Sequence, residues 1–340
     1  MKIKIAINGF GRIGRIFFRQ AFSYPGIDII AINDLGSLEN MAYLLKYDTV
    51  YGPYGRNVKC QMSNVKNFLV VDGKEIRVLQ EKDPSKLPWK DLSIDVVIES
   101  TGVFESREAS TPHLTAGAKR VVITAPAKDE TTPTSTPNVG EEFLKLEKIT
   151  SNASCTTNAA TPVMAVMSKN PGIKKAILNT VHAYTASQGI VDGPDKKDDY
   201  RRARAAAQNI VPSTTGAAIA ATKALPSLKG KFDGISLRVP VVCGSIMDFT
   251  FIADRPTSVE EINSIFKKAA AEKEWQGILA VTEEQLVSSD ILKNPYGSIV
   301  DLSMTKVIDG DLVKILAWYD NEWGYAAMLL KHILAIGKLL

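Results

Sequence analysis

One cysteine of this chain lies in a setting that could make its thiol a nucleophile. Cys155 stands within residues 151–158, a stretch of small hydroxyl and amide residues with no Asp, Glu, Lys or Arg. The residues that follow predict a helix, so the thiol stands at a helix start. Backbone N–H groups at that end of a helix favour negative charge, and we therefore expect a lowered pKa for the thiol. A buried structural cysteine is the competing interpretation.

A second motif predicts a dinucleotide site near the amino terminus. Gly9, Gly11 and Gly14 form the pattern G-x-G-x-x-G between an apolar run at 3–7 and an apolar-periodic helix. Asp34 stands 20 positions beyond Gly14, at the end of the next apolar run. The glycines permit a tight turn and the close approach of a pyrophosphate, and the helix start offers N–H groups to phosphates. The carboxylate can accept hydrogen bonds from a ribose diol.

The remaining pattern predicts an α/β protein with two domains. Short apolar runs typical of buried parallel strands lie at 3–7, 27–32, 94–98 and 120–124. A helix is expected over 39–46, a hairpin over 66–80 and a Thr- and Pro-rich connector over 127–138. Longer strands follow at 175–183, 231–239, 245–253 and 312–319, with helices at 258–271 and within 321–340. We expect a Rossmann-type dinucleotide-binding domain and an α+β catalytic domain, whose mixed sheet carries helices on one face.

Composition argues against several classes of partner. The chain has 340 residues and a net charge of +4, too weak a charge to predict nucleic-acid binding. No apolar run reaches the length of a membrane span, and the first residues enter a strand directly, which leaves no room for a targeting peptide. The three cysteines, Cys60, Cys155 and Cys243, lack metal-ligand spacing. Their odd number predicts a reducing, cytoplasmic location, and no metal site is expected.

The residues Ser154-Cys155-Thr156-Thr157-Asn158 resemble the active-site signature of the phosphorylating glyceraldehyde-3-phosphate dehydrogenase family (type I), and the likeness runs along the whole chain. The resemblance implies that Cys155 is the nucleophile and that His182, at the end of an apolar strand, is its base. The implied reaction is the NAD-dependent conversion of glyceraldehyde 3-phosphate to 1,3-bisphosphoglycerate in glycolysis or gluconeogenesis. It would proceed through a thiohemiacetal and a thioester on Cys155, which inorganic phosphate would then attack.

The resemblance also implies two anion pockets. The pocket for the C3 phosphate of the substrate would contain Thr185 and Arg238, and a buried guanidinium within a strand itself calls for an anion. The pocket for the attacking phosphate would contain Ser154, Thr156, Thr215, Gly216 and Arg202. Arg201 and Arg204 stay open as alternatives to Arg202.

Cofactor residues implied by the resemblance are Gly9, Gly11, Arg12, Ile13, Gly14, Asp34, Lys82, Thr124 and Asn321. Asn321 would bind the nicotinamide carboxamide. Lys82 stands where the family commonly has Arg, so the charge is kept and the planar fork is lost. Asp34 and the family's Pro position, here Pro194, favour NAD. The small, polar pair 36–37 leaves room for a 2′-phosphate, so use of NADP stays open.

The resemblance further implies an organisation into two domains and a homotetramer. Residues 1–154 with 319–340 would bind NAD, the carboxy-terminal helix packing back onto the first domain, and residues 155–318 would form the catalytic domain. The polar segment over 184–212 would lie at the core of the tetramer. One departure is Ala159, where many members have a second cysteine that the mechanism does not need.

Two other functions compete with this interpretation. An erythrose 4-phosphate dehydrogenase shares the scaffold, but water attacks its thioester and a free acid is formed. A binding or regulatory protein could keep the fold and lose catalysis. The residues that resemble the phosphate pocket favour phosphate as the acceptor, and the set of Cys155, His182, Arg238 and Asn321 argues against lost catalysis.

Overall fold

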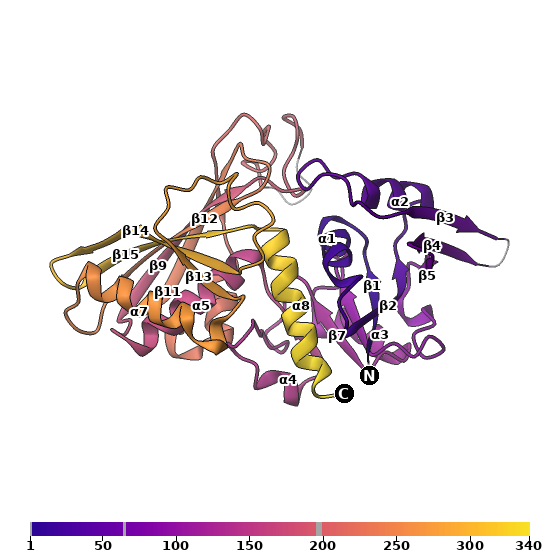
Figure 1. The fold of residues 1–340 in the computed structure, drawn as a ribbon, viewed down its shortest axis with the longest axis horizontal. Coiled ribbons are helices and arrows are strands. Elements are labelled where there is room, and N and C mark those ends of the chain that lie inside the picture. Colours follow the sequence, from indigo (N-terminus) through magenta and orange to yellow (C-terminus); the bar gives the residue numbers. More distant parts are fainter. Residues whose placement is uncertain (1, 64–65, 195–198) are drawn as a thin grey trace. The chain divides into compact units, whose positions relative to one another are not determined.

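The computed structural model describes residues 2–63, 66–194 and 199–340, so the charged positions 195–198 of the polar segment lie outside the described residues. The chain divides into two units, which Figure 1 shows coloured along the sequence. The first unit contains Met1–Ser135, Glu141–Ala153 and Leu329–Leu340. The second contains Thr136–Gly140 and Ser154–Met328.

The first unit is built on an eight-stranded sheet in the order β3-β4-β5-β2-β1-β6-β7-β8. Its strands are β1 (Ile3–Asn8), β2 (Ile27–Asn33), β3 (Val58–Met62), β4 (Asn67–Val71), β5 (Lys74–Leu79), β6 (Val96–Glu99), β7 (Arg120–Ile123) and β8 (Ile149–Ser151). The strands from β5 to β8 in this order are parallel, and β4 is antiparallel to both of its neighbours. From β1 the chain goes to β2 on one side and later to β6 on the other. Ligands bind at such a reversal of strand order in α/β sheets.

The buried strands form where the sequence predicts them, because each is apolar on both faces. All four residues of β6 are buried, as are five of the six of β1. The helices of this unit are α1 (Arg12–Ala21), α2 (Leu38–Lys46), α3 (Arg107–Thr115) and α4 (Phe143–Leu146), with a 3-10 turn at Pro84–Lys86. Helix α1 buries Ile16, Phe17 and Phe18 against the sheet. The predicted helix at 39–46 and hairpin at 66–80 are confirmed.

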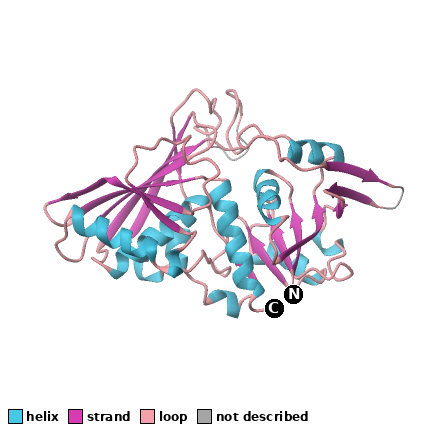
Figure 2. Ribbon diagram, viewed as in Figure 1, coloured by secondary structure: helices cyan, strands magenta, loops and turns pink. Residues whose placement is uncertain are grey.

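The second unit contains a mixed seven-stranded sheet in the order β10-β11-β9-β12-β15-β14-β13. Its strands are β9 (Lys175–Ala183), β10 (Val211–Thr214), β11 (Phe232–Val239), β12 (Ser245–Ile252), β13 (Leu279–Thr282), β14 (Ser298–Ile308) and β15 (Leu312–Tyr319). Helices α5 (Cys155–Lys169), α6 (Ala217–Ala224) and α7 (Val259–Ala271) cover one face of this sheet, as predicted (Figure 2). Two 3-10 turns lie at Pro226–Leu228 and Lys273–Trp275, and α8 (Trp323–Gly337) begins in this unit and ends in the first.

Several strands were not predicted, each for a visible reason. The register of β14 shifts between Asp301 and Lys306, and this irregularity breaks the alternation that marks a strand. Strand β10 contains Pro212 and lies at the sheet edge, where proline is tolerated. Strand β3 is also an edge strand and is exposed at four of its five residues, so it lacks an apolar face.

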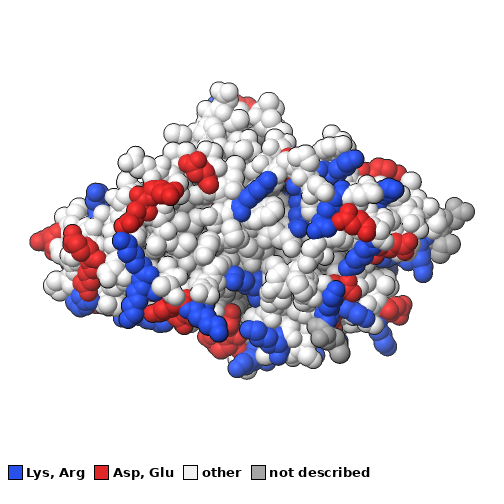
Figure 3. Space-filling view, in the orientation of Figure 1, with Lys and Arg blue, Asp and Glu red and all other residues white. Residues whose placement is uncertain are grey.

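Charged side chains of both signs are interspersed on the face of the molecule seen in Figure 3. Within the described ranges, no helix combines the length and the apolar character that a membrane span requires.

We predict that Gly14→Ala destabilises the protein whereas Gly11→Ala does not. A Cβ atom at Gly14 would lie 2.3 Å from the carbonyl oxygen of Gly9, while one at Gly11 meets no atom within 4 Å. Overpacking against backbone typically costs about 1–3 kcal/mol, and a substitution in open space less than about 0.5 kcal/mol. Thermal unfolding of the two variants measures the difference. Equal unfolding midpoints would contradict the close approach of Gly14 to Gly9.

Candidate active site

The nucleophile predicted from the sequence is the first residue of α5. The side chain of Ser154 caps this helix by accepting a hydrogen bond of 3.1 Å from the N–H of Thr157. Ala153 precedes the cap with φ of 57°, in the left-handed region that residues with a Cβ rarely adopt. Such strain costs on the order of 1–3 kcal/mol and occurs mostly at functional sites. The turn places the Cys155 thiol at the helix start, as predicted.

The predicted base lies beside the thiol. His182, near the end of β9, is 3% exposed, and its Nε2 lies 3.3 Å from Sγ of Cys155. Its Nδ1 lies 2.7 Å from the carbonyl oxygen of Ala183. An acceptor at that distance favours a proton on Nδ1, and that tautomer leaves Nε2 free to accept a proton from sulfur or from a substrate.

An arginine completes the centre. Arg238 on β11 pairs in register with His182 on the neighbouring parallel strand β9. Its Nη1, which can only donate, lies 2.6 Å from Nδ1 of His182 and so competes with the proton that the Ala183 carbonyl favours on that nitrogen. The same Nη1 donates to the carbonyl of Ala183 at 3.1 Å. Its buried Nε has no hydrogen-bond partner among the described residues. A guanidinium in this state is suited to an anion that supplies the missing acceptors.

The protonation states of Cys155 and His182 differ from what the sequence predicted for the thiol. Burial, and next the Arg238 guanidinium, lower the pKa of His182 to about 3. Burial also raises the pKa of the Cys155 thiol, although Arg238 and hydrogen bonds from Thr156 oppose the rise. The expected lowering of the thiol pKa by the helix start is therefore wrong, because desolvation outweighs it. The pair rests as a neutral thiol and a neutral imidazole.

The structure adds a residue that the sequence did not reveal. The hydroxyl of Tyr319 lies 2.9 Å from Oγ1 of Thr156 and 2.6 Å from Oγ1 of Thr180. Its ring packs edge-on against His182, with centroids 6.0 Å apart. Burial raises the pKa of Tyr319, so the hydroxyl stays protonated. Tyr319 thus ties the start of α5 to β9, and no spacing in the sequence signals this role.

Asn321 is held by three donors on one atom. Its Oδ1 accepts from the N–H of Gly244 at 3.0 Å, from Oγ of Ser245 at 2.9 Å and from Sγ of Cys243 at 3.7 Å. Ser245 also accepts from the N–H of Ala183, the neighbour of His182. With Oδ1 occupied, the side chain has only its Nδ2 donors left for a ligand acceptor, such as a carboxamide oxygen.

The arginines of the polar segment have different partners. Arg202 donates to Oγ of Ser213 at 2.6 and 2.9 Å and pairs with Asp199 at 3.1 Å. Its charge makes a small contribution to the lowered pKa of His182. Arg204 instead pairs with Asp192 at 2.7 Å.

Thr185 and Thr215, predicted at the anion pockets, make local hydrogen bonds. Thr215 accepts a hydrogen bond of 3.1 Å from the N–H of Ala217 at the start of α6, whose cap residue is Gly216. Thr185 lies 2.9 Å from Ser187, oxygen to oxygen. No hydrogen bond between described residues links Thr185 or Thr215 directly to Cys155 or His182.

The first unit contains a cavity of about 530 Å³ at the reversal of strand order. Four residues predicted at the cofactor site line it, namely Gly9, Gly11, Asp34 and Lys82. The remaining lining residues are Asn8, Asn33, Leu35, Glu81, Ser100, Thr101, Val103 and Phe104. These follow or end β1, β2, β5 and β6, so the rule that ligands bind at the carboxyl ends of parallel strands could have found them.

The predicted cofactor residues outside this lining are Arg12, Ile13, Gly14 and Thr124, together with Asn321 of the second unit. The side chain of Arg12 pairs with Asp48 at 2.5 Å. Thr124 donates to the backbone carbonyl of Glu99 at 3.0 Å. Among residues 2–63, 66–194 and 199–340, no group of three His, Cys, Asp or Glu side chains is arranged to hold a metal ion.

The geometry of the cavity wall fits a dinucleotide. Gly9 has φ of 93°, and a Cβ atom there would lie 2.6 Å from the backbone of Ser100 and Thr101, so only glycine is accommodated. A Cβ atom at Gly11 would meet no protein atom within 4 Å, which leaves room for a pyrophosphate at the start of α1. The carboxylate of Asp34 accepts from the N–H groups of Phe10 and Gly36 at 2.7 and 2.8 Å, which fixes its orientation.

Comparisons with known proteins cover both units. Residues 3–107 match the family model described as the NAD binding domain of glyceraldehyde 3-phosphate dehydrogenase, and residues 154–321 match that of its C-terminal domain. The glyceraldehyde-3-phosphate dehydrogenase of Streptomyces coelicolor is 47% identical over 342 residues, which cover 100% of both chains. That of Borreliella burgdorferi is 49% identical over 331 residues, 95% of this chain and 96% of the relative. That of Geobacillus stearothermophilus is 47% identical over 96% of each chain. Since relatives this similar align from one end to the other, the chain belongs to the glyceraldehyde 3-phosphate dehydrogenase family.

Proposed function

We propose that the protein is the phosphorylating dehydrogenase that converts glyceraldehyde 3-phosphate to 1,3-bisphosphoglycerate with NAD. The observation that carries this proposal is the 3.3 Å contact between Cys155 and His182, beside an arginine that lacks an acceptor for its buried Nε. A thiol and a base at this distance suit covalent catalysis on an aldehyde. Family membership supports an NAD-dependent oxidoreductase that acts on an aldehyde.

The first step adds the thiol of Cys155 across the aldehyde carbonyl. Sγ forms a bond to the carbonyl carbon, and its proton passes to Nε2 of His182. His182 then returns the proton to the substrate oxygen, which gives a thiohemiacetal and restores the neutral pair. Because the pKa of His182 is low, the ring gives the proton up readily once the oxygen carries negative charge.

The second step oxidises the thiohemiacetal. NAD, when bound, supplies the hydride acceptor for this oxidation. His182 removes the hydroxyl proton as the carbonyl re-forms, which leaves an acyl thioester on Cys155. Inorganic phosphate then attacks the thioester carbon, the carbon–sulfur bond breaks, and Cys155 leaves as thiolate, regaining its proton from His182.

Two anion pockets would orient the substrate and the attacking phosphate. For the substrate phosphate we propose Arg238 and Thr185, and the unpartnered Nε of Arg238 supports this assignment. For the attacking phosphate we propose backbone or side-chain groups of Ser154, Thr156, Thr215, Gly216 and Arg202.

For the cofactor we propose binding by Gly9, Gly11, Arg12, Ile13, Gly14, Asp34, Lys82, Thr124 and Asn321. The oriented carboxylate of Asp34 suits the ribose diol of NAD and opposes the 2′-phosphate of NADP. Weak use of NADP stays open, because Ser37 caps α2 through the N–H of Asn40 and this helix start would favour a phosphate.

The two units suggest how these roles divide. We propose that residues 1–154 with 319–340 bind NAD and that residues 155–318 carry the acyl group. We further propose a homotetramer in the cytoplasm. Ile190, Val191, Tyr200 and Ile210 of the polar segment are 67–88% exposed, as expected of an interface in an assembly. The three free cysteines are compatible with a reducing compartment.

Substitution of either member of the pair tests the mechanism. Cys155→Ser should lower kcat by about 10⁴-fold or more, because a serine hydroxyl is a much weaker acid than a thiol and gives up its proton to the base far less readily. His182→Asn should lower kcat by about 10²–10⁴-fold through loss of the base. Stopped-flow measurement of NADH formation checks both, and retained NAD binding is the control for folding. Turnover of Cys155→Ser within tenfold of the parent would rule out a covalent role.

Initial rates with NAD and NADP, each with and without phosphate, test acceptor and cofactor together. With NAD alone we expect one equivalent of NADH for each active site and then a stop, since the thioester persists. Added phosphate should restore steady turnover, and NADP should lower kcat/KM by about tenfold or more, or ~1.4 kcal/mol. Steady turnover without phosphate would instead indicate hydrolysis, as in an erythrose 4-phosphate dehydrogenase.

Sedimentation velocity tests the assembly. We expect one species with four times the mass of the chain, whose thermal stability rises with protein concentration because dissociation accompanies unfolding. A monomer that binds NAD and turns over at full rate would contradict this proposal.

A further inference from the structure

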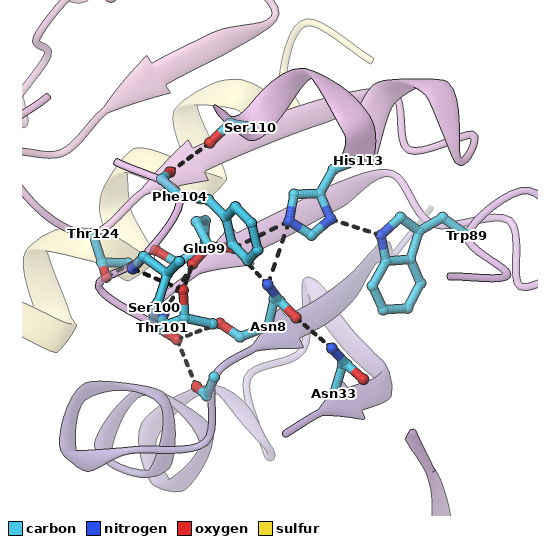
Figure 4. A network of polar contacts seen from close by, with 12 residues as sticks. Asn8, Asn33, Trp89, Glu99, Ser100, Thr101, Phe104, Ser110, His113 and Thr124 are labelled. Carbon is cyan, nitrogen blue, oxygen red and sulfur yellow. Dashed lines mark hydrogen bonds and ion pairs between the residues drawn. The ribbon is translucent and has the colours of Figure 1, made fainter. Parts of the chain in front are cut away.

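A buried carboxylate lies under the cavity of the first unit. Glu99, the last residue of β6, is 2% exposed and accepts hydrogen bonds from four donors (Figure 4). One oxygen accepts from Nδ2 of Asn8 at 2.6 Å and from Nε2 of His113 at 3.1 Å. The other accepts from the N–H of Thr101 at 2.9 Å and from the hydroxyl of the same residue. Four donors satisfy a carboxylate that burial would otherwise destabilise.

The ring of His113 can only donate to Glu99, because a third residue sets its tautomer. Nε1 of Trp89 lies 3.0 Å from Nδ1 of His113, and an indole nitrogen is a donor only. Nδ1 must therefore accept, and the proton of the neutral ring is on Nε2, which faces the carboxylate. Both Trp89 and His113 are fully buried, so no water can replace either partner.

The orientation of the Asn8 side chain is likewise fixed by a third residue. Its Oδ1 accepts from Nδ2 of Asn33 at 2.7 Å, which turns its Nδ2 toward Glu99. Asn33 in turn donates to the carbonyl of Glu81 at 2.8 Å and accepts from the N–H of Glu81 at 2.9 Å. The carboxylate thus fixes a chain of side chains that ends on the loop after β5.

The opposite wall of the cavity is held by the other oxygen. Since the hydroxyl proton of Thr101 goes to Glu99, the oxygen of that hydroxyl is left to accept from the N–H of Val103 at 3.1 Å. Thr101 and Val103 line the cavity on this side, and Asn33 and Glu81 line it on the other. Glu99 itself does not line the cavity.

We propose that Glu99 is a positioning residue for the cofactor, whose carboxylate holds both walls of the nucleotide cavity and whose acceptor role is enforced by Trp89 through His113. This proposal rests on the proposed function in one respect, namely that the cavity holds the nucleotide half of NAD. Glu99 touches no reacting group, so its effect is on the affinity for NAD and not on the chemical steps.

Replacement of the carboxylate by an amide separates this role from simple packing. In Glu99→Gln the amide nitrogen must face either the N–H of Thr101 or the donors of Asn8 and His113. Each arrangement puts donor against donor, and Trp89 prevents His113 from changing tautomer. A buried donor left without an acceptor typically costs enough to change affinity by about tenfold or more.

The test measures the Kd for NAD by titration calorimetry and kcat at saturating NAD. For Glu99→Gln we expect Kd to rise about tenfold or more, with kcat within about threefold of the parent. Asp34→Ala serves as a control on the cavity itself. If Asp34→Ala weakens binding and a folded Glu99→Gln does not, the positioning role is wrong and the cavity assignment stands. If neither variant weakens binding, the cofactor site lies elsewhere and the proposal falls with it.

A second substitution tests whether Trp89 fixes the tautomer of His113. Trp89→Phe removes the donor on Nδ1 of His113, so that Nε2 can become an acceptor for the amide of Gln at position 99. Adding Glu99→Gln to Trp89→Phe should therefore raise the Kd for NAD by less than adding Glu99→Gln to the parent. An equal or larger rise in Kd would show that Trp89 does not fix the tautomer of His113.

A pair of substitutions at Thr101 keeps the test open if Glu99→Gln does not fold. Thr101→Val removes both hydrogen bonds of the hydroxyl, and Thr101→Ser restores them at the same place. We expect weaker NAD binding for Thr101→Val and parental binding for Thr101→Ser. Equal affinities of both variants and the parent would overturn the positioning role.

Discussion

The packing of the second unit brings the Cys155 thiol into contact with the His182 imidazole. Sγ at the start of a helix and Nε2 near the end of a strand lie 3.3 Å apart, although other elements of the chain separate the two residues. Helix α5 packs against one face of the sheet. The Tyr319 hydroxyl forms one hydrogen bond with a hydroxyl of α5 and another with a hydroxyl of β9. Because such a pair works only at hydrogen-bond distance, the rigidity of this packing is part of the chemistry.

Burial sets the charge state of the pair. Desolvation disfavours both the thiolate and the imidazolium, and the Arg238 guanidinium further disfavours the imidazolium. A neutral pair keeps the thiol unreactive until a carbonyl arrives to accept the electrons and the proton together. An anion bound at Arg238, where we propose the substrate phosphate, would offset its charge and make His182 more basic, so substrate binding and activation of the base would be coupled through one arginine.

In the first unit, a buried carboxylate orients the polar side chains around it. Parallel strands end together at one edge of the sheet, so their last residues converge from β1, β2 and β6. Polar groups gathered there must satisfy one another, and Glu99 supplies four acceptor positions for them. Each partner is oriented by a further bond, and for His113 that bond comes from the Trp89 indole, which can only donate. The cavity above therefore has walls whose polar atoms point in fixed directions.

Local sequence determined much of this protein. Apolar runs are buried strands wherever both faces are covered, and the glycines at 9 and 14 are required by backbone contacts. The motif around Cys155 pointed to the family and to a candidate nucleophile. Tertiary structure alone decided the rest. The register shift in β14 and the proline of the edge strand β10 broke the patterns that mark strands. The roles of Tyr319, Glu99 and Trp89 depend on partners distant in the chain, which no spacing reveals. The pKa of Cys155 was mispredicted because a helix start acts locally, whereas desolvation is the sum of everything that folds around the sulfur.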